Sequence, residues 1–383
     1  MGLPRRTPPT HPGDAVTVST GIESPAIGAE EREALVEAVR DLLRRRGDST
    51  TVRAAMSASG RIDSSLWQTL CTEIGVAALA VPERFGGAGA SWMESAAVLE
   101  ELGAALSPVP ALGSALATGT ILLAGDDDAS SRLLPALAAG ERTAAVCWAG
   151  ERGWQAPGVR ADAGLLTGTA HFVVDGESAD VLLVLAAGPG THLTLHEVAA
   201  DADGVSVSPM PVLDPTRALS SVRFDEVASA AIPAPDDLAS RLRALAWALL
   251  SAEQVGGAQR ALDLTVEYTK SRKQFGRTIG SFQALKHRMA DMYVLVETAR
   301  SISRAAVAAL AADDPDTADL ALAAHVYCSD ANRRVAGEAI QLHGGIGITW
   351  EHDIQLYFKR AQATSQMFGA PHTAVTEAAR ALR

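Results

Sequence analysis

The spacing of apolar residues changes twice along the 383-residue chain, and this constrains its fold more than any other feature. Residues 29–140 carry apolar side chains at helical intervals, residues 141–235 carry short strand-like runs, and residues 236–383 return to helical spacing. We therefore predict an α+β fold of three successive parts. A doubly wound α/β fold is disfavoured because its strands and helices would alternate along the whole chain.

Helical patterns dominate both flanking parts. The stretch Glu30 to Arg46 has apolar residues three or four positions apart, acidic residues at its start and arginines at its end, as the helix dipole favours. Residues 282–296 and 317–341 show the same spacing in the C-terminal part. Alanine is abundant and aromatic residues make up only 4% of the chain, which also favours helix.

The middle part consists of short strand-like runs separated by turn-forming residues, which is typical of a small β-domain. Residues 167–176 are predicted to form a strand that ends in a turn at Asp175-Gly176. The run 181–185 is wholly apolar and short enough for a buried strand. Glycine, proline and aspartate separate these runs, so the strands are expected to be short.

Charge and composition exclude several partners and sites. The formal net charge is −12 and the basic residues form no long run, so nucleic acid is not an expected partner. Three scattered cysteines show neither zinc-ligand spacing nor a disulfide framework, which fits a reducing cytoplasm and no metal site. No apolar run is long enough to span a membrane. Residues 1–28 are polar and proline-rich, which predicts a disordered leader.

Two motifs in the C-terminal part carry the strongest functional information. The first is Arg272-Lys273-Gln274-Phe275-Gly276, followed by Phe282-Gln283-Ala284-Leu285-Lys286-His287. The second is Gln341-Leu342-His343-Gly344-Gly345-Ile346-Gly347, followed by Lys359-Arg360-Ala361. In order and spacing, about residues 30 to 380 of this chain resemble the acyl-CoA dehydrogenase family.

The resemblance implies a fold, a cofactor and an assembly. The fold would have an N-terminal helical domain, a middle β-barrel-like domain and a C-terminal four-helix bundle. In the family, Arg272, Gln274 and Phe275 would reach the FAD of a neighbouring subunit, and Gln341, Gly344 and Gly345 would approach its diphosphate. Arginine suits a diphosphate because its planar donors match two phosphate oxygens, and paired glycines let backbone N–H groups come close. A homo-oligomer or a heterotetramer with a homologous subunit is therefore expected.

The same resemblance shows that the usual catalytic base is missing. The family glutamate stands 27 residues after the position of Gln341, where this chain has Phe368. An alternative glutamate position on an earlier helix is occupied by Ala246. Phe368 keeps only a backbone N–H, which could donate to a thioester carbonyl but cannot accept a proton. The family's flavin-contacting loop is replaced by residues 146–150, in which Trp148 could stack on a ring or fill the core.

Two other residues are candidates for a replacement base. Glu253 lies on an apolar helical stripe, so its carboxylate is expected to be buried with a raised pKa, about 10 Å along the helix from Ala246. His372 follows Phe368 by four residues and could approach the site from the next helical turn. The alternative for Glu253 is a buried structural acid, and the alternative for His372 is a surface histidine without a catalytic role.

The expected function is FAD-dependent α,β-desaturation of an acyl-CoA or acyl-carrier thioester, with an electron-transfer flavoprotein or a similar acceptor. Phe368 together with the intact cofactor motifs resembles the base-less subunit of heteromeric family members that act on steroid side chains. A flavin oxidase or monooxygenase of the same fold is one alternative. A non-catalytic subunit that stabilises a partner is the other.

Overall fold

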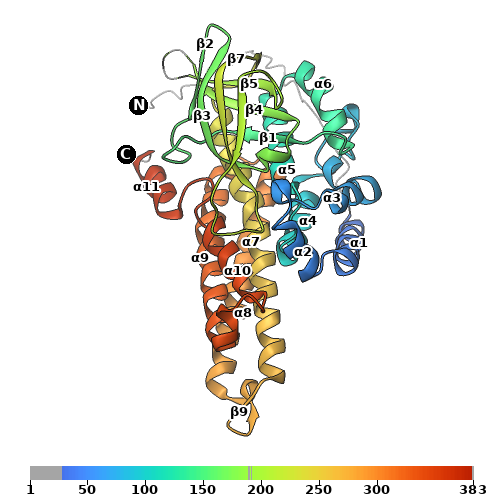
Figure 1. Cartoon of the computed structure of the whole chain (residues 1–383), viewed down its shortest axis with the longest axis vertical. Coiled ribbons are helices and arrows are strands. Elements are labelled where there is room, and N and C mark those ends of the chain that lie inside the picture. Colours follow the sequence, from blue (N-terminus) through green and yellow to red (C-terminus); the bar gives the residue numbers. More distant parts are fainter. Residues whose placement is uncertain (1–27, 189, 191, 382–383) are drawn as a thin grey trace, which may run out of the picture.

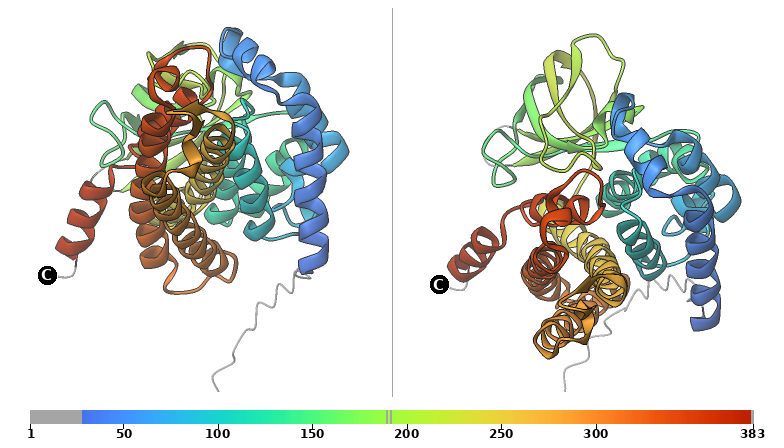
Figure 2. Two further views of the ribbon diagram at one scale, coloured as in Figure 1. Left: turned by 90° about the horizontal axis from the view of Figure 1, so that it is seen from below. Right: turned by 60° about the horizontal axis from the view of Figure 1, so that its bottom comes forward.

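The computed structural model describes residues 28–381 except 189 and 191, and the predicted leader therefore lies almost entirely outside the described residues. The chain folds into N-terminal helices, a central sheet and a C-terminal helical domain, in that order (Figure 1). The predicted α+β class and the order of its parts are confirmed. The sheet sits at one end of the long C-terminal helices, and the N-terminal helices pack along their side (Figure 2).

The N-terminal part consists of helices joined by short turns. The α-helices are α1 (Ala29–Arg46), α2 (Ser49–Ala55), α3 (Ser64–Thr69), α4 (Trp92–Ala104), α5 (Ala111–Ala124) and α6 (Asp127–Ala138). Several begin with a side-chain cap: Asp48, Asp63, Ser91 and Asp126 each accept a hydrogen bond from a backbone N–H of the first turn. Helix α1 matches the predicted stretch, with acids first and arginines last.

The middle part is one eight-stranded sheet in the hydrogen-bonded order β6-β7-β3-β2-β4-β5-β8, with β1 pairing with β4. Its strands are β1 (Ala144–Cys147), β2 (Val159–Asp162), β3 (Leu165–Val174), β4 (Val181–Ala187), β5 (Leu193–Ala199), β6 (Val205–Pro209), β7 (Leu219–Ala228) and β8 (Ala230–Ile232). Most neighbours are antiparallel, whereas β4 pairs in parallel with β1 and β2. The apolar run predicted as a buried strand is β4, and its first six residues are buried.

The C-terminal part is built on three long helices. They are α7 (Leu238–Ser271), α8 (Gln283–Ala311) and α9 (Thr317–His343), and the shorter α10 (Ile354–Thr364) packs on α7 and α9. These four helices form the predicted bundle, and α11 (Pro371–Ala381) projects from its side (Figure 1). The hairpin of β9 (Lys273–Gln274) and β10 (Arg277–Thr278) lies at the far tip of the bundle.

Close helix packing joins the N-terminal part to the bundle. A Cβ atom on Gly256 of α7 would lie 1.8 Å from the carbonyl oxygen of Glu100 on α4. A Cβ atom on Gly103 of α4 would lie 2.3 Å from the carbonyl oxygen of Glu253. Only glycine allows the two backbones to approach this closely. This contact between α4 and α7 fixes the position of Glu253 on α7 relative to the N-terminal helices.

Candidate functional site

The first predicted cofactor motif forms an exposed hairpin at the tip of the bundle. Helix α7 ends at Ser271, and Phe275 and Gly276 then make the two-residue turn between β9 and β10 with φ angles of 51° and 77°. A bulky residue rarely adopts this left-handed conformation, and such backbone strain is concentrated at functional sites. The Phe275 side chain is 91% exposed, and Arg272 and Gln274 are exposed beside it. All three therefore point to a surface that a second molecule can contact.

The second predicted motif lies at the end of α9. Gly344 has φ 63° and ψ −142°, a conformation that is open almost only to glycine, and no atom lies within 4 Å of a Cβ placed on Gly344 or Gly345. Gln341 and both glycines are exposed. The backbone is therefore open to the close approach of a ligand. The ring of His343 stacks on Tyr268 of α7 at 4.5 Å, which holds the two motifs at the same end of the bundle.

Phe368 lies at the opposite end of the bundle, where it meets the sheet. It is 3% exposed and has a left-handed φ of 59°. Trp247 Nε1 donates a hydrogen bond to the Phe368 carbonyl at 3.1 Å, and His325 Nε2 lies 2.7 Å from the Gly369 carbonyl. These contacts fix the backbone of the turn between α10 and α11. Its conformation is therefore set by buried side chains of α7 and α9.

The cleft in front of Phe368 is filled by aromatic rings. Trp148 stacks on Phe368 with ring centroids 6.3 Å apart, and Trp154 meets it edge-on at 5.6 Å. Phe172 packs on Trp154 at 5.2 Å. The remaining cavity measures about 10 Å³, which is at most the space of one water molecule. Of the two roles considered for Trp148, the structure shows core filling.

Glu253 is buried as predicted, but the expected rise of its pKa is wrong. Burial acts to raise the pKa of this 5% exposed carboxyl, yet the positive charges of Arg217 and Arg360 outweigh that effect and hold its pKa below the ordinary value. Arg360 Nη1 donates to Glu253 Oε1 at 2.8 Å, and Arg217 donates to Oε2. A carboxylate held in two ion pairs is a poor proton acceptor, so Glu253 is a structural acid.

The position of His372 also differs from the expectation. It lies on α11, which begins at Pro371 after the turn at Gly369, and not one turn further along a helix that carries Phe368. Its side chain is exposed. Helix α11 leads away from the bundle (Figure 1). His372 is therefore poorly placed to serve a site at Phe368.

The ionic network that surrounds Glu253 was not predicted from the sequence. Arg360 of α10 also donates from Nε to Asp214 and from Nη2 to the Thr216 hydroxyl at 2.6 Å. Asp214 and Arg217 belong to the loop before β7, so the network ties the sheet to the bundle. In the sequence, Arg360 is recognisable only as part of the Lys359-Arg360-Ala361 motif. Its position on the apolar face of α10 is the sequence feature that could have indicated burial of its side chain.

Asp175 is a second missed residue, at the end of β3. Burial raises the pKa of its carboxyl to about 6, although Arg217 opposes the rise, and its Oδ2 accepts a hydrogen bond from the Gly113 N–H at 3.3 Å. A carboxyl with a raised folded pKa stabilises the fold in its protonated form. That contribution is complete below about pH 4 and is lost as the pH rises through about 6.

We therefore expect Asp175→Asn to stabilise the protein at neutral pH. Asparagine keeps the acceptor for Gly113 and tolerates a left-handed backbone, but it has no charge to bury. The gain should reach about 2 to 3 kcal/mol above pH 7 and vanish near pH 4, as two pKa units correspond to about 2.7 kcal/mol. Urea unfolding at pH 4, 6 and 8 measures it. A gain that is equal at all three values would contradict this assignment.

Comparison with known proteins decides the family. The model for the acyl-CoA dehydrogenase N-terminal domain matches residues 29–141, and the model for the C-terminal domain matches residues 244–382. The chain belongs to the acyl-CoA dehydrogenase family. This makes an oxidoreductase of the acyl-CoA dehydrogenase type the function class of the chain, as the sequence had predicted.

Similar acyl-CoA dehydrogenases match nearly their full length. Acyl-CoA dehydrogenase IpdE2 of Mycolicibacterium smegmatis is 42% identical over 90% of this chain and 96% of its own. IpdE2 of Mycobacterium tuberculosis is 41% identical over 89% and 94%. Among solved structures, a variant of the Tcur3481–Tcur3483 steroid ACAD superposes with a TM-score of 0.84 at 31% identity, covering 91% of this chain and 96% of that one. The ChsE4–ChsE5 complex of Mycobacterium tuberculosis gives 0.85 at 29% identity, covering 93% and 98%.

Two further observations concern membrane-spanning helices and metal sites in this acyl-CoA dehydrogenase. None of the helices in the described ranges has the length and hydropathy needed to cross a membrane. Within the same residues, no group of three or more histidine, cysteine, aspartate or glutamate side chains is arranged to hold a metal ion. The described features that bear on a cofactor are thus the exposed motifs at one end of the bundle and the filled cleft at the other.

Proposed function

We propose that this chain is the base-less subunit of a heteromeric acyl-CoA dehydrogenase, and that FAD lies between it and a homologous chain that carries the catalytic glutamate. The observation that carries the proposal is the aromatic filling of the cleft at Phe368, which leaves about 10 Å³. A flavin ring and a thioester need far more room, so this chain's own cleft does not fit them. The exposed motifs at the other end of the bundle do fit the outer part of a dinucleotide.

The chain would contribute binding and orientation to the shared site. Arg272 offers two parallel donors to a diphosphate, and the open backbone at Gly344 and Gly345 allows its N–H groups to approach the same oxygens. Phe275 presents a flat apolar face that would otherwise remain in water. FAD, when bound, accepts a hydride from the β-carbon of the acyl group. The homologous subunit would hold the thioester and remove the α-proton.

Similar proteins suggest the partner and the substrate class. ChsE4–ChsE5 is a complex of two named chains, and Tcur3481–Tcur3483 is described as a steroid ACAD. We infer a homologous partner subunit and the CoA thioester of a steroid-derived acid as substrate. An electron-transfer flavoprotein is the acceptor we predict.

The decisive experiment compares this chain alone with the chain co-expressed with a homologous glutamate-bearing neighbour. We expect the lone chain to lack thioester-oxidising activity, and the pair to contain one FAD for each two chains. Arg272→Gln should weaken FAD binding by the pair about 10- to 100-fold, because a charge-assisted contact contributes about 1.5 to 3 kcal/mol. Lys273→Gln is the matched control, since neighbouring residues of a strand point to opposite faces.

Three outcomes would contradict the proposal. Rapid thioester oxidation by the lone chain would show that its own cleft works. A stable pair without FAD would favour a purely structural subunit. Oxygen consumption that follows flavin reduction in the pair would favour an oxidase or monooxygenase of the same fold.

A further inference from the structure

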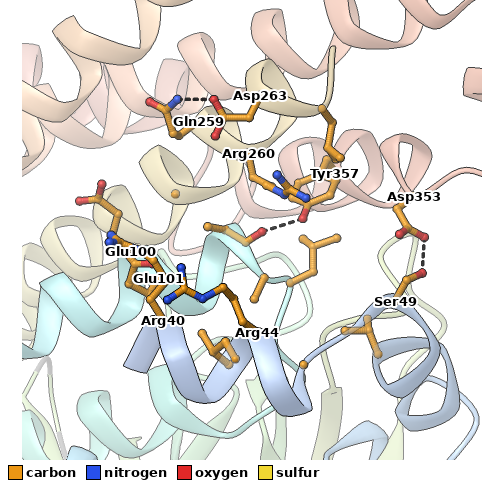
Figure 3. Close-up of a pocket in the computed structure, with 18 of the residues that line it drawn as sticks. Arg40, Arg44, Ser49, Glu100, Glu101, Gln259, Arg260, Asp263, Asp353 and Tyr357 are labelled. Carbon is orange, nitrogen blue, oxygen red and sulfur yellow. Dashed lines mark hydrogen bonds and ion pairs between the residues drawn. The ribbon is translucent and has the colours of Figure 1, made fainter. Parts of the chain in front are cut away.

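A second, much larger cavity lies away from both parts of the proposed site. It has a volume of about 790 Å³ and opens midway along α7, between α1, α2 and α4 on one side and α7 and α10 on the other (Figure 3). Cavities of about 300 to 1,000 Å³ hold molecules of cofactor or drug size. None of the predicted FAD-contacting residues, and neither Phe368 nor Glu253, lines it.

Four aliphatic side chains form the apolar part of the inner wall of this cavity. Leu43, Val52, Leu106 and Leu356 line it, and each is nearly fully buried in the fold. The Tyr357 hydroxyl donates a 2.6 Å hydrogen bond to the Ala104 carbonyl, and Tyr357 also lines the cavity. Such a wall suits an aliphatic or alicyclic body, whose burial contributes about 25 cal/mol per Å².

The charges around the opening largely cancel. Arg40 is paired with Glu101 at 2.7 Å, and Arg300 is paired with Glu100. The arginines that line the cavity are Arg40, Arg44, Arg260 and Arg300, and the acids are Asp48, Glu100, Glu101, Asp263 and Asp353. A ligand with several phosphates, such as a coenzyme A or a dinucleotide, would meet more negative than positive charge here. The lining therefore favours a ligand with at most one negative charge.

Arg260 is the cation best placed to receive that charge. It projects from α7 beside Tyr357 (Figure 3), and its Nη1 lies 3.8 Å from Glu267 Oε1, which is beyond hydrogen-bonding distance. Its neighbour Asp263 already accepts a hydrogen bond from Gln259 at 2.9 Å. A carboxylate can replace the long contact to Glu267 with two parallel N–H···O bonds.

We propose that this cavity binds an amphipathic monocarboxylate, with the carboxylate on Arg260 and the apolar body against the wall formed by Leu43, Val52, Leu106 and Leu356. The site is separate from the FAD-binding surface, and the proposal does not depend on the heteromer. Binding is therefore expected in the isolated chain.

Titration calorimetry with dodecanoate on the isolated chain tests the proposal. We expect saturable binding of one dodecanoate per chain and no comparable binding of dodecyltrimethylammonium, which has the same tail and the opposite charge. Arg260→Gln should weaken dodecanoate binding about 10- to 100-fold. Arg84→Gln is the control, because Arg84 also has a single long ion pair, 3.4 Å from Asp127, and does not line the cavity.

A second variant tests the cavity without changing any charge. Ala104→Leu adds volume to the lining and should also reduce binding, with thermal melting used to verify that both variants remain folded. Absence of saturable dodecanoate binding would overturn the proposal. Binding that is unchanged in folded Arg260→Gln, or equally strong binding of the cationic amphiphile, would overturn it as well.

Discussion

Replacing Phe368 with glutamate, the residue that the family has at this position, is expected to leave the isolated chain inactive and to destabilise it by about 3 to 5 kcal/mol. The new carboxylate would enter a space bounded by Trp148 and Trp154, in a cavity of about 10 Å³. It would lose the packing of a ring and bury a charge among the rings of Trp148 and Trp154. Urea unfolding measures the stability, and anaerobic reduction of added FAD by an acyl-CoA measures the activity.

Phe368→Leu is the matched control for this prediction. Leucine also removes the ring but adds no charge, so it should cost about 1 to 2 kcal/mol. The difference between the two variants in free energy of unfolding measures the cost of burying the carboxylate. This difference should shrink as the pH falls and the glutamate is protonated. Thioester oxidation by the Phe368→Glu chain alone would show that only the base was missing. It would also refute the closed cleft on which the proposed function rests.

The sequence predicted a missing base but could not show a missing cleft. The position of Phe368 could be predicted from that of Gln341, because only the end of α9, the helix α10 and the turns beside them separate the two residues. The rings that fill the cleft come from residues 148, 154 and 172 of the β-domain, between 196 and 220 residues before Phe368. No periodicity in the chain indicates that these segments meet. Only the packing of the sheet against the bundle brings them together.

For Glu253 the burial was predicted from local sequence, whereas the direction of its pKa shift depends on distant residues. Its position on an apolar stripe of α7 predicted burial, since helical periodicity is a local property. Its partners Arg217 and Arg360 lie 36 and 107 residues away, so the direction of the pKa shift could not be inferred from the stripe. Elements were predicted well for the same reason: α1, β4 and α9 each have an unbroken local pattern. The aromatic cleft, the ionic network and the large cavity each depend on contacts between distant segments.

Arg360→Met is expected to destabilise the protein by about 3 to 5 kcal/mol, or to prevent folding. Arg360 is 5% exposed and is the shared partner of Asp214 and Glu253, which are themselves buried. Among the described residues, its removal leaves Asp214 without an ion-pair partner and Glu253 with Arg217 alone. Chemical unfolding of the variant measures the loss. Arg132→Met, which removes a half-exposed arginine from its ion pair with Glu197, should cost about 1 kcal/mol or less.

The pH dependence should distinguish loss of the cation from loss of packing. In the wild-type protein the pKa of Glu253 is held down, so its ion pairs stabilise the fold above its unfolded pKa of about 4.3, and this stability is lost as the pH falls below that value. In Arg360→Met the Glu253 carboxylate keeps only Arg217 as its cation, so its protonation should relieve part of the penalty. The wild-type advantage should therefore narrow as the pH falls toward and below about 4.3, the unfolded pKa of a glutamate. The double variant Arg360→Met/Glu253→Gln should recover part of the loss at pH 7; a constant difference at every pH would instead assign the effect of Arg360 to its packing.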